Sequence, residues 1–233
     1  MKRLTEEEKM GVYKAIFNRR DIRSFINKSI STEKLEHILL AAHHAPSVGF
    51  MQPWNFIIIK EDETKKQLAE IVEKERRALS IHYEGTDRDL KFLQLKIAGI
   101  LEAPVTICVT CNPFRGGDHV LGRNSIPETD MMSVSCAIQN MWLAAYAEGI
   151  AMGWVSFYKK ADVRRILNIP YHIDPVALIS LGYTEDYPEK PILEINNWEK
   201  RRQLENLIFD NKWGEESTIT ITNNPIENSN EGE

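Results

Sequence analysis

Apolar and polar residues recur along this chain with two periods, which separates predicted helices from predicted strands. Apolar positions three or four apart predict a helix that Thr5 opens with a capping box, and a second helix that Ser31 or Thr32 caps and Pro46 stops. Further helices are predicted over about 63–82, 90–102, 131–148 and 161–169, the last stopped by Pro170. Short apolar runs predict strands over 55–60, 105–111, 152–157 and 175–183.

The order of these elements argues against two common nucleotide-binding folds. Helices and strands interleave without the regular spacing of strand–helix–strand units, and no GxGxxG motif follows a strand. A P-loop is absent from the sequence as well, so a bound phosphate would have to be held by arginine side chains. After Trp213 the sequence turns polar and acidic, which predicts one domain over 1–213 and a disordered tail over 214–233.

The composition narrows the class of partner and the compartment. The 233 residues carry a formal net charge of −5 and are 42% apolar, which is typical of a globular protein and favours neither a nucleic acid nor an anionic membrane as partner. No apolar run approaches the roughly 20 residues that span a bilayer. The charged start "MKRLTEEEKM" lacks the apolar core of a signal peptide, so we expect a cytoplasmic protein.

Two residue pairs carry metal-ligand chemistry but are predicted to be structural. Cys108 and Cys111 have CxxC spacing within a predicted strand, where residues three apart point to opposite faces, and no second CxxC follows. We therefore predict core packing for both thiols and no metal site. His43 and His44 end a predicted helix, where capping of the last carbonyls is expected.

The stretch "NRRDIRSF", residues 18–25, concentrates three arginines around one carboxylate. In an extended segment Arg19, Asp21 and Arg23 share one face and Arg20 lies on the other, which suits a phosphate monoester. Asp21 would then be an internal counter-ion or a catalytic base beside the anion. A solvated salt-bridge segment between two helices is an equally good interpretation from these residues alone.

Five segments occur in an order that resembles one family: "RRDIRSF", "AAHHAPSVGFMQPWNF", "EAPVTICVTC", "VLGRNSIPETDMMSVSCAIQNMWLAAYAEGIAMGWVSF" and "NNWEKRRQLENLIFDNKW". They resemble the nitroreductase superfamily of FMN enzymes, and within it the branch of aerobic 5,6-dimethylbenzimidazole synthases. The resemblance covers roughly residues 12–213. It implies an α+β fold with a central mixed or antiparallel sheet flanked by helices, in a domain-swapped homodimer with FMN at the subunit interface.

The resemblance also implies a reaction in which FMN is the substrate. Reduced FMN reacts with molecular oxygen, and the resulting peroxyflavin fragments into 5,6-dimethylbenzimidazole, the lower axial ligand of vitamin B12, and erythrose 4-phosphate. A separate flavin reductase would supply the reduced FMN. Two alternatives stay open: a conventional nitroreductase or reductive dehalogenase that recycles its FMN, and a flavin-binding scaffold without activity.

Several site residues follow from matching the family motifs. The resemblance assigns Arg19, Arg23 and Arg201 to the FMN phosphate, and Arg20 to the ribityl chain or the flavin ring. Asp21 stands where most relatives carry Ser or Thr, and is implied to be an acid/base group. The alternative for Asp21 is a carboxylate that simply pairs with a neighbouring arginine.

Two further regions are implied to touch the flavin. Ser156 would lie near flavin N5 and C4a, with an ordinary strand serine as the alternative, and a binding loop would contribute Pro46, Ser47, Val48 and Gln52.

A lid over the flavin is expected between about 83 and 100. Arg88 and Lys96 are its candidate contacts, and the lid would keep water from the reacting flavin. Trp54 and Phe56, which follow the binding loop, are predicted to be core residues and not flavin contacts.

Overall fold

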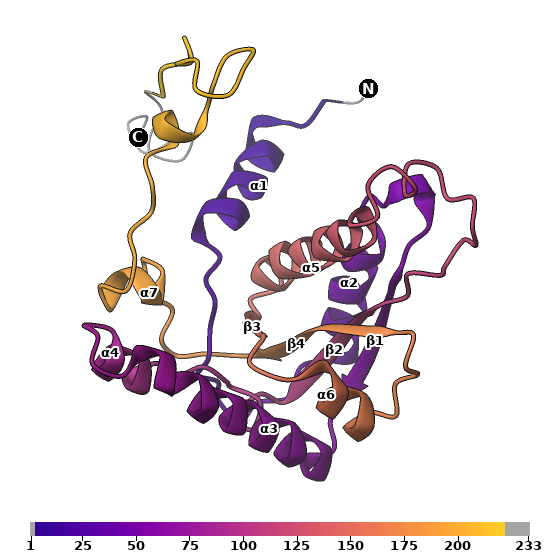
Figure 1. The fold of residues 1–233 in the computed structure, drawn as a ribbon, viewed down its shortest axis with the longest axis vertical. Helices are drawn as coiled ribbons and strands as arrows, with labels where there is room; N and C mark the ends of the chain where they lie inside the picture. Colours follow the sequence, from indigo (N-terminus) through magenta and orange to yellow (C-terminus); the bar gives the residue numbers. More distant parts are fainter. Residues whose placement is uncertain (1–2, 222–233) are drawn as a thin grey trace. The chain divides into compact units, whose positions relative to one another are not determined.

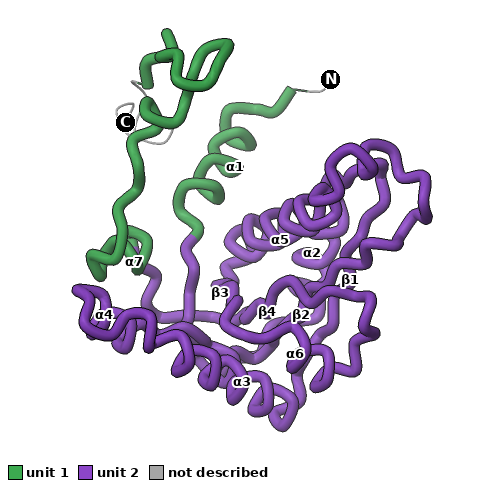
Figure 2. The backbone as a smooth tube through the Cα atoms, viewed as in Figure 1, with its two compact units in different colours: residues 1–19, 189–233 green, residues 20–188 purple. Residues whose placement is uncertain are grey.

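The chain forms two compact units in the computed structural model, which describes residues 3–221 (Figure 2). Unit 1 combines residues 1–19 with 189–233, and unit 2 comprises residues 20–188. Unit 1 contains helix α1 (Glu6–Asn18), helix α7 (Ile192–Ile195) and the 3-10 helix η3 (Leu204–Leu207).

The capping box that opens α1 is confirmed. The Thr5 hydroxyl accepts a hydrogen bond from the Glu8 amide at 3.2 Å, and the Glu8 carboxylate accepts one from the Thr5 amide at 2.7 Å. At the other end of unit 1, the Asp210 carboxylate accepts hydrogen bonds from the amide of Thr218 and the hydroxyl of Ser217, which lower the pKa of Asp210. Residues 222–233 of the predicted tail lie outside the described residues, and the domain boundary at 213 stays a prediction.

Unit 2 is built on one four-stranded antiparallel sheet in the order β1-β2-β4-β3 (Figure 1). The strands are β1 (Trp54–Ile59), β2 (Val105–Cys111), β3 (Ala151–Val155) and β4 (Asp174–Gly182). The helices are α2 (Thr32–His43), η1 (Val48–Phe50), α3 (Asp62–Ser80), η2 (Ile81–Tyr83), α4 (Asp89–Gln94), α5 (Thr129–Ala147) and α6 (Lys160–Ile166).

Two hydrophobic clusters cover the two faces of this sheet. Helices α2 and α5 pack on one face through a cluster that includes Ile38 and Met141, and α3 and α6 pack on the other through Leu68 and Val163 (Figure 1). Since strand side chains alternate between faces, neighbouring residues of β2 enter different clusters. The predicted α+β class with helices on both sides of the sheet is confirmed.

The helix predicted over 90–102 is wrong beyond Gln94. The chain leaves the helical conformation at Leu95 (φ −66°, ψ 125°), and residues 95–99 run without secondary structure. A Cβ at Gly99 would lie 2.5 Å from the carbonyl oxygen of Arg23. The close packing of this stretch on another segment overrides its helical pattern, and such long-range contacts are not visible in local periodicity.

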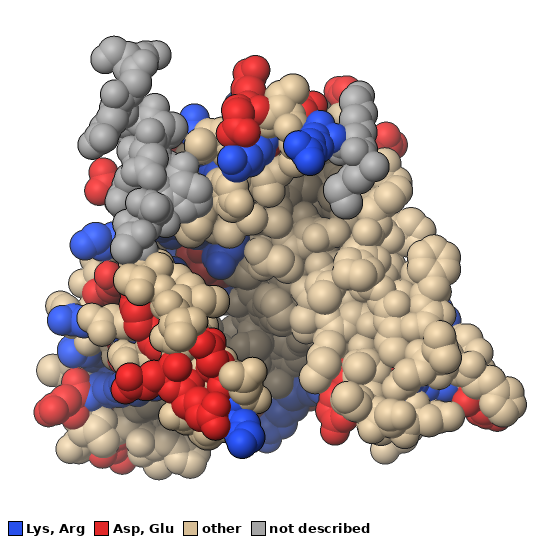
Figure 3. Space-filling view, turned by 90° about the horizontal axis from the view of Figure 1, so that it is seen from above, with Lys and Arg blue, Asp and Glu red and all other residues tan. Residues whose placement is uncertain are grey.

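Helix α5 is buried on one side only. Val134, Ile138 and Met141 are fully buried against the sheet, whereas Met132 is 56% exposed and Cys136 is exposed. In the space-filling view, the right-hand side, where Figure 1 has α2 and α5, carries few charged side chains (Figure 3). Among the described residues, no helix combines the length and the apolar character needed to cross a bilayer.

Candidate active site

The arginine segment, residues 20–25, lies along β3, which is an edge strand of the sheet. The Ile22 amide donates to the carbonyl of Met152 at 3.0 Å, and Asp21 forms an isolated parallel bridge with the same residue. A Cβ at Gly153 would lie 2.1 Å from the carbonyl oxygen of Ile22, so only glycine permits this approach. The backbone of the arginine segment is therefore held tightly on the strand.

Asp21 is fixed by both of its carboxylate oxygens. Oδ1 accepts a hydrogen bond from the Trp154 amide at 2.9 Å, and Oδ2 accepts one from Nη2 of Arg23 at 2.5 Å. Arg23 also donates to the carbonyl of Trp154. Asp21 and Arg23 thus lie on the same side of the segment, and the paired arrangement that the sequence allowed for Asp21 is present.

One donor of this cluster has no acceptor. Nη1 of Arg23 is buried and makes no hydrogen bond with any described residue, while the Asp21 side chain stays 43% exposed. A buried guanidinium nitrogen without a partner is costly, so it marks a position that an anionic or carbonyl oxygen of a ligand would satisfy.

Ser156 follows directly on the end of β3. It is exposed, it lies two residues beyond Trp154, and its hydroxyl makes no hydrogen bond to the described residues. The alternative of a strand serine bonded to the backbone does not fit this hydroxyl. Asp21 and Arg23 thus bond the backbone of Trp154, and Ser156 follows that residue by two positions along the chain.

The other residues of the arginine segment are anchored by its backbone. The Arg20 amide donates to the Tyr187 hydroxyl at 2.7 Å, and Nε1 of Trp142 on α5 donates to the Arg20 carbonyl at 3.2 Å. Arg19 caps the C-terminus of α1 and, like the exposed Arg201, belongs to unit 1. A common phosphate site of Arg19, Arg23 and Arg201 stays a prediction.

The second candidate region is the Pro46 loop, residues 46–53, between α2 and β1. The Val48 amide donates to the hydroxyl of Ser133 on α5 at 3.0 Å, and the Gln52 amide donates to the hydroxyl of Ser47 at 3.0 Å. Phe50 and Gln52 both adopt positive φ, at 55° and 50°. Non-glycine residues occupy this left-handed region at a cost of about 1–3 kcal/mol each, and they do so mostly at functional sites.

The two candidate regions contact different parts of α5. The Pro46 loop reaches Ser133, whereas the arginine segment reaches Trp142, nine residues and about 13 Å further along the helix. The chain brings Asp21, Arg23 and Ser156 to one place and Ser47, Val48 and Gln52 to another.

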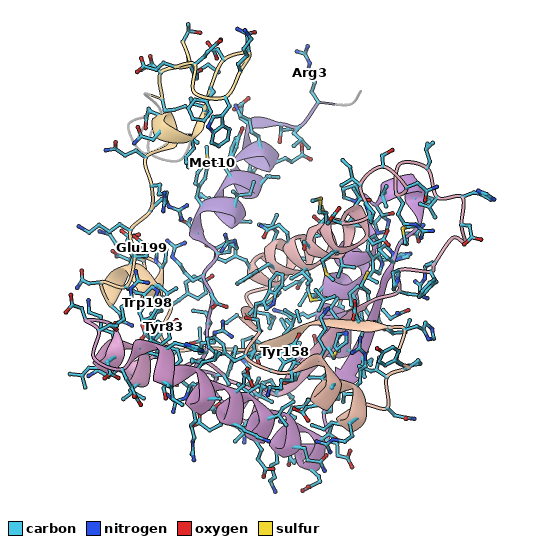
Figure 4. All side chains as sticks on the ribbon, viewed as in Figure 1. Arg3, Met10, Tyr83, Tyr158, Trp198 and Glu199 are labelled. Atoms are coloured by element: carbon cyan, nitrogen blue, oxygen red, sulfur yellow. The ribbon has the colours of Figure 1, made fainter. Side chains whose placement is uncertain are left out.

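The predicted lid residues lie in different surroundings. Lys96 pairs with Glu102 at 2.8 Å and is 3.4 Å from the hydroxyl of Ser24, so it lies beside the arginine segment. Arg88 is exposed at the start of α4. Tyr83, labelled in Figure 4, is the last residue of η2. Its ring stacks on that of Phe92 in α4, with ring centroids 4.5 Å apart, and so joins these two short helices.

The structural assignments of the neighbouring residues are confirmed with one difference. Cys108 and Cys111 are buried on opposite faces of the sheet, and burial raises the pKa of these thiols to about 12 and about 11. His44 bonds the Leu40 carbonyl at 2.8 Å, as predicted for a cap. His43 does not cap, because its Nδ1 accepts from Nε1 of the buried Trp54 at 3.2 Å.

Sequence reasoning missed the side chains that hold the Pro46 loop. Nη1 of Arg115 donates to the carbonyls of Gln52 and Trp54, at 2.8 and 3.0 Å. Arg123 donates to the carbonyls of Pro113 and Arg115 in the long loop that precedes α5. The available signal was the pair of arginines in a Gly- and Pro-rich loop, where free backbone carbonyls need donors.

Comparison with known proteins shows which family the chain belongs to. A family model described as "Nitroreductase family" matches residues 16–183. The chain belongs to the nitroreductase family. Its antiparallel sheet between helices agrees with that fold, while the homodimer and the domain swap stay predictions.

Two curated relatives and one solved structure illustrate what the chain is similar to. A 5,6-dimethylbenzimidazole synthase from Rhodospirillum rubrum is 34% identical over 193 residues, covering 79% of this chain and 87% of the relative. An iodotyrosine deiodinase from Haliscomenobacter hydrossis is 35% identical, covering 78% of this chain and 83% of the relative. A crystal structure of oxidized iodotyrosine deiodinase bound to FMN and 3-iodo-L-tyrosine superposes with a TM-score of 0.65 at 21% identity, covering 77% and 94%.

Proposed function

We propose that this protein binds reduced FMN and fragments it with molecular oxygen, releasing 5,6-dimethylbenzimidazole and D-erythrose 4-phosphate. The observation that carries the proposal is the cluster at the end of β3, where Asp21 is oriented by the Trp154 amide and by Arg23. The similarity to the Rhodospirillum rubrum synthase supports the same reaction.

The residues present fit FMN. The unpartnered Nη1 of Arg23 would donate to an oxygen of the flavin's phosphate, with Arg19 and Arg201 as further phosphate ligands and Arg20 at the ribityl chain or the flavin ring. The hydroxyl of Ser156 would bond the flavin ring near N5, and the loop residues Pro46, Ser47, Val48 and Gln52 would contact the ring from another side. Bound FMN supplies the redox chemistry with oxygen.

Asp21 would move protons in this reaction. Its carboxylate keeps a fixed orientation through Oδ1, while its side chain remains open on the ligand's side, being 43% exposed. A carboxylate within hydrogen-bond reach of the flavin can accept a proton and return it, and an amide cannot. The hydrogen bond from Arg23 orients the second carboxylate oxygen, Oδ2.

A second candidate function is a conventional FMN enzyme that recycles its flavin, such as a reductive dehalogenase. The 35% identity to the Haliscomenobacter hydrossis deiodinase favours it. Asp21 argues against it, because the resemblance implies a hydroxyl residue at this position in the recycling branches.

Two partners belong to the proposal. A homodimer would bring the Pro46 loop of one copy towards the arginine segment of the other, which suits their separate contacts along α5 and the half-exposed surface of this helix. A separate flavin reductase would supply the reduced FMN. Light scattering of the purified protein tests the dimer, and a monomeric mass would contradict it.

The experiment gives the purified protein excess chemically reduced FMN in air and follows flavin and products by chromatography. Loss of flavin together with the appearance of 5,6-dimethylbenzimidazole supports the proposal. Full recovery of oxidised FMN with hydrogen peroxide as the product contradicts it and favours the recycling enzyme, for which nitroaromatics and halotyrosines are the substrates to try.

The same assay with Asp21→Asn tests the role of the carboxylate. Asn can still accept the Trp154 hydrogen bond, so we expect a folded protein with nearly unchanged affinity for reduced FMN and a yield reduced by at least about 100-fold. Asp118→Asn, in an exposed loop, is the matched control. A normal benzimidazole yield from the Asp21 variant would remove the residue from the mechanism.

A further inference from the structure

The guanidinium of Arg115 links the Pro46 loop to the long loop between β2 and α5, residues 112–128. Nη1 donates to two backbone carbonyls, of Gln52 at 2.8 Å and of Trp54 at 3.0 Å. Nη2 donates to Oδ1 of Asn55 at 2.5 Å. The Arg115 side chain therefore bonds both the end of the Pro46 loop and the first residues of β1.

The sheet orients the oxygens that accept hydrogen bonds from Arg115. Nδ2 of Asn55 donates to the hydroxyl of Thr110 on the paired strand β2 at 3.1 Å, which turns the Asn55 oxygen towards Arg115. The amide of Asn112, at the end of β2, donates to the Pro53 carbonyl at 2.7 Å. These bonds fix the position of Arg115 relative to strands β1 and β2.

The contact lies where the loop backbone is strained. Gln52 has φ 50°, and its carbonyl is the acceptor of the shorter Arg115 bond. Left-handed backbone at a residue with a side chain persists only where surrounding contacts over-determine it. Two charge-assisted hydrogen bonds, one to Gln52 itself and one to Trp54 two residues later, offset that cost.

Arg115 is not arranged to bind a ligand itself. Both terminal nitrogens donate to neutral oxygens of the chain, and the side chain is only half-exposed. A guanidinium used in this way acts through the backbone that it holds.

We propose that Arg115 is a positioning residue, which fixes the left-handed conformation at Gln52 and thereby the direction in which the Gln52 side chain meets its ligand. That this ligand is FMN rests on the function proposed above. The conformational part of the inference stands on the contacts of the unliganded chain alone.

The test compares three variants of the full chain. Arg115→Met removes the donors and keeps a long apolar stem, and Arg115→Lys keeps the charge with donors for one carbonyl. Arg165→Met is the control, because Arg165 is 69% exposed on α6 and makes only a 3.6 Å pair with Asp162. Thermal unfolding of all three establishes that they are folded.

Amide hydrogen exchange of residues 46–54 without ligand is the first readout, and binding of reduced FMN is the second. In Arg115→Met we expect exchange to accelerate and FMN affinity to fall, each by at least about tenfold, since three charge-assisted bonds are lost. Arg115→Lys should restore part of both, and Arg165→Met should change neither.

The outcomes separate this inference from the proposed function. Unchanged exchange in Arg115→Met overturns the positioning role, and a fall in FMN affinity without faster exchange does so too, because Arg115 would then touch the ligand. If exchange accelerates but the unmodified protein binds no FMN, the proposed function fails and the positioning of Gln52 by Arg115 is supported.

Discussion

The arginine segment and the Pro46 loop both lie outside the α-helices and the strands of the sheet, and they are held in place by different means. The arginine segment is joined to the edge of β3 by backbone contacts, with Gly153 and Gly99 leaving room for its carbonyls. The Pro46 loop is held by side chains that bond its backbone, chiefly Ser133 and Arg115.

This difference determines which substitutions each region tolerates. Along the arginine segment a single added methyl group meets a backbone oxygen, which cannot move without displacing a strand. In the Pro46 loop a Cβ at Gly49 would also lie too close to its neighbours, 2.8 Å from the Leu121 amide nitrogen, and in addition each lost donor leaves a backbone group without its partner. Both regions are therefore sensitive to size, and the Pro46 loop depends in addition on side-chain hydrogen-bond donors and acceptors.

The largest expected effect is that of Gly153→Ala. The new Cβ would lie 2.1 Å from the Ile22 carbonyl oxygen, so either β3 or the arginine segment must shift. We expect a loss of stability of about 3 kcal/mol or more, at the upper end of what overpacking causes. Chemical denaturation of the purified variant measures it.

Gly11→Ala is the matched control for that substitution. Gly11 lies in α1, and an added Cβ there would meet nothing within 4 Å, so Ala should stabilise the helix by about 0.5–1 kcal/mol. Equal stability of Gly153→Ala and the unmodified protein would show that the arginine segment is loosely attached to β3.

An intermediate effect is expected for Ser133→Ala, which tests the side-chain anchors of the Pro46 loop. The hydroxyl of Ser133 donates to the Thr129 carbonyl at 2.6 Å and accepts from the Val48 amide at 3.0 Å. Its removal leaves that half-buried amide without a partner, which should cost about 1–2 kcal/mol and speed amide exchange at Val48.

Ser135→Ala provides the comparison on the same helix. Ser135 also donates to the carbonyl four residues earlier, at 3.0 Å, but it is exposed and accepts no hydrogen bond from the loop. A similar loss of stability in both variants would mean that the bond within the helix, and not the bond to Val48, accounts for the effect.

The elements of the fold were predictable from local patterns, because each buries one periodic face. The capping box at Thr5 and the strand over 105–111 are confirmed as predicted. The helix predicted up to Glu102 failed at Leu95, since the packing of Gly99 on Arg23 is a contact between residues 76 positions apart. The order of strands in the sheet was likewise not encoded in any one window of sequence.

The candidate site divides in the same way. Motifs identified Asp21, Arg23 and Ser156, and the structure collects these three at the end of β3. Arg115 and Ser133 escaped notice because they touch backbone atoms, whose positions a sequence does not show. The sequence alone does not distinguish an arginine or serine side chain that faces solvent from one that bonds the backbone.

A final contrast between the two regions concerns their carboxylates. Asp21 is paired with Arg23, whereas Asp130, in the first turn of α5 and three residues before the Ser133 that bonds the Pro46 loop, is buried and its Oδ1 has no hydrogen-bond partner among the described residues. Burial raises the pKa of Asp130, although the charge of Arg123 lowers it in part. The charged form of Asp130 therefore costs stability in the native protein.

Asp130→Asn should give the smallest change, a gain below about 1 kcal/mol at pH 7. The folded-state pKa is raised, so the native protein binds the proton more tightly than the unfolded chain and loses stability as the pH rises through that raised pKa. The advantage of the variant should thus be present above the raised pKa and vanish below the ordinary value of 3.8. Denaturation of both proteins from pH 3 to 8 measures the difference, with Asp118→Asn as the control for net charge. A variant less stable than the unmodified protein at pH 7 would mean that the helix N-terminus and Arg123 outweigh the burial of the carboxylate, and that the Pro46 loop rests on a favourable charge as the arginine segment does.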